Sequence, residues 1–185
     1  MRRGLKIAAL LFLPIVLLAG GFISYVLATN NFHPITPGEA YRSAQLDRDE
    51  LEYYIKKYNI RSIVNLRGKN LNEPWYREEA QVSAELNVAH YNIGLSASHE
   101  LKDEDIKKLL EIFKTAPRPV LIHCQAGADR SGLVAAMWKV VVDKEPKSEA
   151  KKQLSILYWH IPIGKTSAMD RSFEKWDPQA NTVIK

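Results

Sequence analysis

The hydrophobic pattern alternates between helical and extended segments over most of the chain. Leu51, Tyr54, Ile55 and Tyr58 recur at helical spacing, which predicts a helix that begins near Asp47. Short apolar runs predict buried strands over 61–66, 88–93 and 119–123. Strands separated by helices imply an α/β fold with a mainly parallel central sheet and helices on both faces.

Further helices follow from apolar residues that share one side of a helical repeat. After Pro74, a residue suited to a first helical turn, Trp75, Glu79, Val82 and Leu86 share one side. The same reasoning places helices over 106–113, 131–142, 148–159 and 168–176. The strand at 119–123 is expected in the centre of the sheet, with the loop that follows it at the edge where such sheets bind ligands.

The N-terminal segment has a different pattern, a charge-free and mostly apolar run over 7–27. Its length matches the roughly 20 residues of a transmembrane helix, and basic residues precede it. We therefore expect a single membrane anchor, with the domain that follows on the non-cytoplasmic (periplasmic or extracytoplasmic) side. A cleaved signal peptide ending near Ala28 is the alternative. We expect residues 1–30 to form this anchor or signal peptide, 28–38 a short linker, and 31–185 the folded domain.

Composition and charge exclude several classes of function. The 185 residues suffice for one domain with a real core. Arg2, Arg3 and Lys6 supply three of the 26 basic residues, which leaves 23 against 21 acidic residues elsewhere. That near-balance argues against a nucleic-acid surface. A single cysteine excludes an intrachain disulfide and a cysteine-rich metal site, and we predict no metal and no organic cofactor.

A strand, a tight loop and a helix follow one another over 120–142 and carry the candidate chemistry. The loop runs from Cys124 to Arg130 with Gly127 in its middle. Such a loop turns backbone N–H groups toward an anion, and the helix dipole adds positive potential. We predict that Cys124 is a thiolate nucleophile, that Arg130 grips two phosphoryl oxygens, and that Ser131 donates its hydroxyl to the sulfur and helps it leave.

The substrate-binding residues expected from this loop are Gln125, Ala126, Gly127, Ala128, Asp129 and Arg130. A buried, inert cysteine is the alternative interpretation. It leaves His123, Gly127, Arg130 and the Ser131–Gly132 pair without an explanation, so we favour the anion site.

Residues 123–132 fit every fixed position of H-C-x5-R-[ST]-G, the loop of the cysteine-dependent tyrosine and dual-specificity phosphatases. The chain resembles bacterial members of this family over roughly 39–176, including the segments 41–45 and 64–67. The resemblance implies a phosphatase-type fold and phosphorylated substrates. It also suggests that Arg42 and Arg67 add positive charge near the phosphate, although ordinary surface arginines are the default interpretation.

The resemblance further implies an aspartate general acid on a loop before the cysteine. The corresponding loop, 94–103, has no aspartate at the expected place. We choose Glu100 as the general acid and His99 as the next candidate, while an exposed loop acid remains the alternative for Glu100. Asp103 and Asp105 are interpreted as the start of the following helix.

Three other residues carry weaker hypotheses. His123 is expected to orient the loop by hydrogen bonds rather than to transfer protons. Asp129 either holds a water or tethers the loop, or is a solvated side chain. Trp75 flanks the pocket or packs in the core.

The sequence thus predicts a phosphomonoester hydrolase that works through a phosphocysteine intermediate, most simply a protein tyrosine or dual-specificity phosphatase. A lipid- or inositol-phosphate phosphatase with the same chemistry is one alternative. A non-catalytic module that binds phosphorylated ligands is another. A rhodanese-like sulfur carrier has no need of arginine at this spacing. The expected partners are a phosphorylated protein or small phosphomonoester and, through the N-terminal helix, a membrane.

Overall fold

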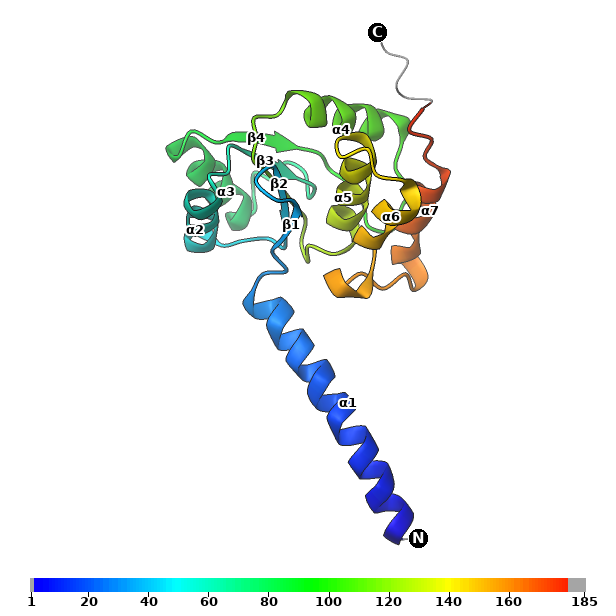
Figure 1. Ribbon diagram of the computed structural model, residues 1–185. Helices are drawn as coiled ribbons and strands as arrows, with labels where there is room; N and C mark the ends of the chain where they lie inside the picture. The colour runs from blue at the N-terminus through cyan, green and yellow to red at the C-terminus, as the bar shows by residue number, and fades with distance from the viewer. Residues whose placement is uncertain (1, 180–185) are drawn as a thin grey trace.

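A five-stranded sheet with strand order β1-β2-β5-β3-β4 forms the centre of the computed structural model, which describes residues 2–179 (Figure 1). The strands are β1 (His33–Thr36), β2 (Ala40–Ser43), β3 (Ser62–Asn65), β4 (Ala89–Asn92) and β5 (Val120–His123). Among the strand pairs of the described residues, β1–β2 is antiparallel and the other three are parallel. The predicted mainly parallel sheet is therefore confirmed, and β5 is its central strand.

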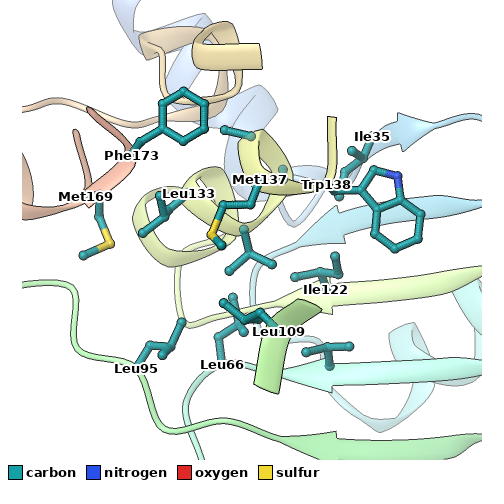
Figure 2. Close-up of a cluster of buried hydrophobic side chains, with 14 of the residues drawn as sticks. Ile35, Leu66, Leu95, Leu109, Ile122, Leu133, Met137, Trp138, Met169 and Phe173 are labelled. Atoms are coloured by element: carbon teal, nitrogen blue, oxygen red, sulfur yellow. The ribbon is translucent and has the colours of Figure 1, made fainter. Parts of the chain in front are cut away.

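Helices cover both faces of the sheet, as predicted. On one face lie α2 (Arg48–Tyr58) and α3 (Pro74–Glu85), whose Leu51, Ile55 and Val82 pack with Ile63 and Leu121 of the strands (Figure 1). On the other face lie α4 (Asp103–Thr115), α5 (Asp129–Val141), α6 (Lys147–Ala150) and α7 (Ser167–Lys175). Figure 2 shows side chains of that larger core, which include Leu109, Leu133, Met137, Ile122 and Phe173.

The parallel register brings three strand ends together beside the candidate loop. His123, the last residue of β5, is paired with Ser43 of β2 and with Asn65 of β3. Residues that follow β2, β3 and β5 therefore meet at one edge, where open parallel sheets place their ligands.

The linker predicted over 28–38 is wrong, because this segment contains β1. Ile35 is buried in the core, and Thr36 accepts a hydrogen bond from the indole of Trp138 at 3.1 Å. Thr36 also donates to Asp143 at 2.6 Å. These partners lie about a hundred residues away, so local sequence gives little sign of the strand.

The single helix predicted over 148–159 is also wrong. The chain forms α6 and then two short 3-10 turns, η1 (Lys151–Gln153) and η2 (Ile156–Tyr158), and a third, η3 (Gly164–Thr166), precedes α7. Two tertiary demands explain the break. The carbonyl of Gln153 accepts a hydrogen bond from Arg42 at 2.8 Å, and Trp159 adopts a left-handed conformation, φ 66°, just before the buried His160.

The N-terminal segment forms α1 (Arg2–Ala28) (Figure 1). Within the described part of the chain, none of the helices combines the length and the apolar character needed to cross a bilayer. The predicted transmembrane helix over 7–27 is therefore wrong, and the predicted non-cytoplasmic placement of the catalytic domain loses the membrane anchor on which it rested. α1 contains Pro14 and the Gly20–Gly21 pair, residue types with low helix propensity.

Candidate active site

The loop from Cys124 to Arg130 is held from behind by hydrogen bonds to four consecutive carbonyl groups. The bonds run from Gln45 N–H to Gln125 O at 3.1 Å, from Asn31 Nδ2 to Ala126 O at 3.0 Å, and from Arg42 Nη2 to Gly127 O and to Ala128 O, both at 2.9 Å. A trans peptide directs its C=O and the next N–H to opposite sides. The N–H groups of 126–129 therefore face away from these donors, as an anion cradle requires.

Glycine is the only residue type that this loop tolerates at position 127, in its middle. Its φ is +68°, in the left-handed region. A Cβ atom there would lie 2.6 Å from the backbone nitrogen of Ala44 and 2.6 Å from the carbonyl carbon of Ser43. The loop thus presses directly on the end of β2, which a side chain at this position would prevent.

Arg42 supports the loop from beneath, and its side chain has no exposed surface. Besides the two loop carbonyls, its Nη1 donates to the backbone and side-chain oxygens of Gln153, at 2.8 and 3.0 Å. Its guanidinium also lies 4.5 Å from the ring centre of Tyr158. Burial lowers the pKa of Arg42 to about 10, which leaves it charged at neutral pH. Arg42 is therefore neither a surface arginine nor a phosphate ligand, but a support of the loop.

Cys124, Arg130 and Ser131 lie at the same edge of the sheet, with Cys124 only 2% exposed. Nη1 of Arg130 donates to the carbonyls of Leu66 and Leu95, both at 3.3 Å, which anchors the guanidinium between β3 and the loop after β4. Among the described residues, the buried Nε of Arg130 and Oγ of Ser131 have no hydrogen-bond partner. Buried polar atoms normally have hydrogen-bond partners. The free Nε of Arg130 is therefore suited to bind a phosphoryl group, and the free hydroxyl of Ser131 is suited to bind the sulfur of Cys124.

Residues 36–173 match the family model described as "DSP-PTPase phosphatase fused to NAD+ Kinase". The chain belongs to this phosphatase family. It is accordingly a cysteine-dependent phosphatase, a phosphoric monoester hydrolase, as the loop motif predicted.

Solved structures share the fold of this phosphatase at low sequence identity. TpbA from P. aeruginosa is 20% identical with a TM-score of 0.66, over 83% of this chain and 89% of TpbA. The catalytic core of Siw14 is 18% identical with a TM-score of 0.67, over 83% of this chain and 89% of that one. One TpbA structure is a complex with pTyr, and Siw14 from S. cerevisiae is named a PP-IP phosphatase.

A buried carboxylate stands behind the catalytic edge of the phosphatase. Glu79 of α3, 3% exposed, lies 3.0 Å from Nε2 of His123 and 2.8 Å from Nε2 of His90, and it accepts from Gln45 at 2.8 Å. Nδ1 of His123 is 3.4 Å from the carbonyl of Cys124. His123 therefore orients the strand end, in line with its predicted role. One sign of this buried role is visible in the sequence, since Glu79 is an acidic residue on the otherwise apolar side of the predicted helix.

Glu79 should make stability depend on acid pH. Burial alone would raise the pKa of Glu79, but the charge of His123 and the hydrogen bonds from His123, His90 and Gln45 hold it well below its usual range. The stabilisation is fully present above the ordinary glutamate pKa and is lost as pH falls below it.

We expect Glu79→Gln to lower the free energy of unfolding by about 1–3 kcal/mol at neutral pH, because a buried network loses its charge. The variant should also lose less stability than wild type on acidification. Urea titrations at neutral and acid pH measure both effects, with the exposed neighbour variant Glu78→Gln as control. An identical acid dependence in Glu79→Gln and wild type would contradict this role.

Arg67 follows β3 and places a second guanidinium beside the site. It stacks on the ring of Trp75, 3.5 Å from the ring centre, and donates to Gln45 at 3.0 Å. Burial and then the nearby charge of Arg130 lower the pKa of Arg67. That mutual influence agrees with the prediction of added positive charge near the phosphate, and Trp75 flanks the same edge.

Asp129 tethers the loop, which is one of the roles predicted for it from the sequence. Its carboxylate lies 2.7 Å from Nδ1 of His160, a fully buried residue that the sequence did not mark as functional. No motif spacing relates the two positions, which are 31 residues apart.

The predicted general acid, Glu100, is engaged elsewhere. Its two carboxylate oxygens accept from Arg171 at 2.9 Å and from Lys175 at 2.7 Å, both on α7. The hydrogen bonds from Lys175 and then Arg171 lower the pKa of Glu100, so it is ionised at neutral pH. A general acid must carry a proton, so this geometry opposes the role. His99, the second candidate, bonds instead with the hydroxyls of Ser96 and Ser98 at 3.0 and 3.1 Å.

Proposed function

We propose that this phosphatase hydrolyses aryl phosphomonoesters of the phosphotyrosine type through a phosphocysteine intermediate. The observation that carries the proposal is the loop whose four consecutive carbonyls are bonded outward, with the buried Nε of Arg130 left free. Backbone N–H groups and a guanidinium are then preorganised for the three equatorial oxygens of a phosphoryl group.

The first step is attack of the Cys124 thiolate on phosphorus. The sulfur–phosphorus bond forms as the bond from phosphorus to the ester oxygen breaks, and the electron pair leaves with the phenoxide. Arg130 and the loop amides hold the equatorial oxygens throughout. In the second step water attacks phosphorus and the phosphorus–sulfur bond breaks, with its electron pair returning to sulfur as the thiolate. Inorganic phosphate leaves carrying both protons of the water. We assign Ser131 a hydrogen bond to the departing sulfur, since its buried hydroxyl has no partner among the described residues.

The ion pairs of Glu100 with α7 indicate that the enzyme hydrolyses aryl phosphates faster than alkyl phosphates. With both oxygens bound to cations of α7, Glu100 holds no proton to give to a leaving alkoxide. A phenoxide is a far weaker base, since the ordinary pKa of tyrosine is about 10, and it departs with less help. This supports phosphotyrosine over phosphoserine and phosphothreonine, with water completing the protonation.

We expect Glu100→Gln to change kcat by no more than about twofold on an aryl phosphate and on an alkyl phosphate, the range of an ordinary surface substitution. Steady-state kinetics on both substrates measure this, with Glu104→Gln as the matched control. A loss confined to the alkyl phosphate in Glu100→Gln would restore Glu100 as the general acid.

Arg67 favours a second candidate substrate class, inositol polyphosphates. The guanidinium of Arg67 stacks on Trp75, and the charge of Arg130 is close enough to lower its pKa. It therefore offers a second contact for an anion beside Arg130. Siw14, which shares the fold, is named a PP-IP phosphatase. A substrate with a neighbouring phosphate would use both arginines.

Turnover by the full-length chain tests the proposal. Phosphate release is compared on a phosphotyrosine peptide, a phosphoserine peptide and an inositol polyphosphate, with vanadate as inhibitor. The proposal expects vanadate-sensitive turnover that is fastest on the phosphotyrosine peptide. Faster release from the inositol polyphosphate, reduced selectively by Arg67→Ala, would favour the second class. The absence of turnover on all three would refute the proposed function.

A further inference from the structure

A buried imidazole lies between two carboxylates that come from different helices. Nδ1 of His160 is 2.7 Å from Oδ1 of Asp129, and Nε2 is 2.9 Å from Oδ2 of Asp170. The His160 side chain has no exposed surface, while the Asp129 and Asp170 side chains are 23% and 17% exposed. Two ionised carboxylates can both accept from this ring only when both of its nitrogens carry protons, so the geometry fits an imidazolium.

The charged surroundings of His160 agree with this protonation state. Burial alone would lower the pKa of His160, but the hydrogen bonds to Asp129 and Asp170 outweigh it and raise the pKa above the ordinary value. The charged groups that face the ring are Asp129 at the start of α5 and Asp170 on α7. Arg42 of β2 interacts with the same Asp129 carboxylate from the underside of the loop.

The backbone before His160 is bent to bring the ring into this position. Trp159 has a φ of 66°, in the left-handed region that a tryptophan rarely adopts. The N–H of His160 then donates to the carbonyl of Ser155 at 3.1 Å, which closes the turn. Figure 1 shows this segment (orange) running between α6 and α7. A strained turn with a buried ion triad at its end is a costly arrangement, which points to a use beyond simple packing.

Asp129 is the first residue of α5 and directly precedes Arg130, the guanidinium proposed to grip the phosphoryl oxygens. We propose that His160 is a positioning residue of this phosphatase: its imidazolium ties the first residue of α5 to α7 and so fixes where Arg130 presents its guanidinium. The inference rests on the proposed function, because it assigns His160 to the same reaction.

The tie depends on the second proton of the ring. When that proton is lost, one N–H remains for two carboxylates, and either Asp129 or Asp170 loses its partner. The stabilisation from His160 is fully present below the ordinary histidine pKa and is lost as pH rises through the raised folded value. Turnover should therefore fall on the alkaline side as Arg130 loses its fixed position.

The kinetic test uses the full-length chain and an aryl phosphate across neutral and alkaline pH. We expect His160→Gln to lower kcat about 10- to 100-fold at neutral pH, the cost of a small displacement of a catalytic group, and to remove the alkaline fall. Asp170→Asn keeps the ring but removes one charge, so the fall should move to lower pH. Glu174→Gln, an exposed carboxylate on the same helix, should change neither kcat nor the profile. A His160→Gln variant with wild-type kcat and alkaline fall would overturn the proposal.

Nitrogen-15 NMR of the wild-type histidines supplies a readout that does not depend on a variant that folds. The expected spectrum shows both ring nitrogens of His160 protonated at neutral pH, with deprotonation only on the alkaline side. A neutral ring at neutral pH would overturn the proposal even if His160→Gln is inactive. Wild type that fails to hydrolyse any phosphomonoester would instead refute the proposed function, while the NMR result would still report whether the tie exists.

Discussion

Cys124→Ser is expected to reduce hydrolysis of an aryl phosphate by at least about 10⁴-fold, because the covalent step depends on a sulfur nucleophile. A serine hydroxyl remains protonated at neutral pH and is a far weaker nucleophile than a thiolate. The backbone cradle does not depend on the thiol, since its carbonyls are held by Asn31, Arg42 and Gln45.

The same variant should therefore still bind substrate. Initial rates on an aryl phosphate and equilibrium binding of a phosphotyrosine peptide measure the two properties separately. Ser96→Ala, a hydroxyl change on the neighbouring loop, is the control for general effects of substitution. Turnover that persists in Cys124→Ser at more than a trace level would show that another group is the nucleophile.

Arg42→Met is expected to lower the free energy of unfolding by about 3–5 kcal/mol, the usual cost of removing one partner from a buried charged network. The side chain of Arg42 is fully buried and bonded to Gly127 O, Ala128 O and two oxygens of Gln153. Methionine fills much of the volume but leaves these acceptors without donors. The loop and the α6–η1 segment should loosen together.

Urea denaturation of Arg42→Met and of Arg61→Met measures this effect. Arg61 is exposed and precedes β3, so its replacement should change stability by less than about 0.5 kcal/mol. Arg42→Lys should have an intermediate stability, since a single ammonium group cannot donate hydrogen bonds to both Gln153 and the loop. Equal stability of Arg42→Met and wild type would contradict the supporting role.

The local part of the site was predictable from sequence because its determinants are local. Cys124, Gly127 and Arg130 act through a strand, a turn and a helix start that are contiguous in the chain. The mainly parallel sheet followed from the alternation of short apolar runs with helical repeats, and the structure confirms it.

The supporting residues were not predictable, because each reaches the loop from a distant segment. Asn31 donates to Ala126 across 95 positions, and Arg42 donates to Gly127 across 85. Nothing in the sequence around Asn31 or His160 marks a buried polar contact. The apolar run over 7–27 was misleading because we inferred a transmembrane helix from its hydropathy alone. None of the described helices is long and apolar enough to cross a membrane.

The loop over 94–103 shows a third limit. Position within the loop suggested Glu100 as the general acid, but the cations of α7 that engage it lie more than 70 residues further along the chain. The role of Glu100 stays a prediction that these ion pairs oppose. Fold similarity to TpbA and Siw14 does not decide it, since both are about one-fifth identical to this chain.

The most direct test of the central claim is to trap the covalent intermediate. Full-length protein is mixed with an aryl phosphate, quenched in acid within the first turnovers, digested and examined by mass spectrometry. The account predicts one phosphoryl group on the peptide that contains Cys124, at the sulfur, and none in Cys124→Ser. Rapid turnover with unmodified Cys124 at every quench time, or with the phosphoryl group on another residue, would contradict it.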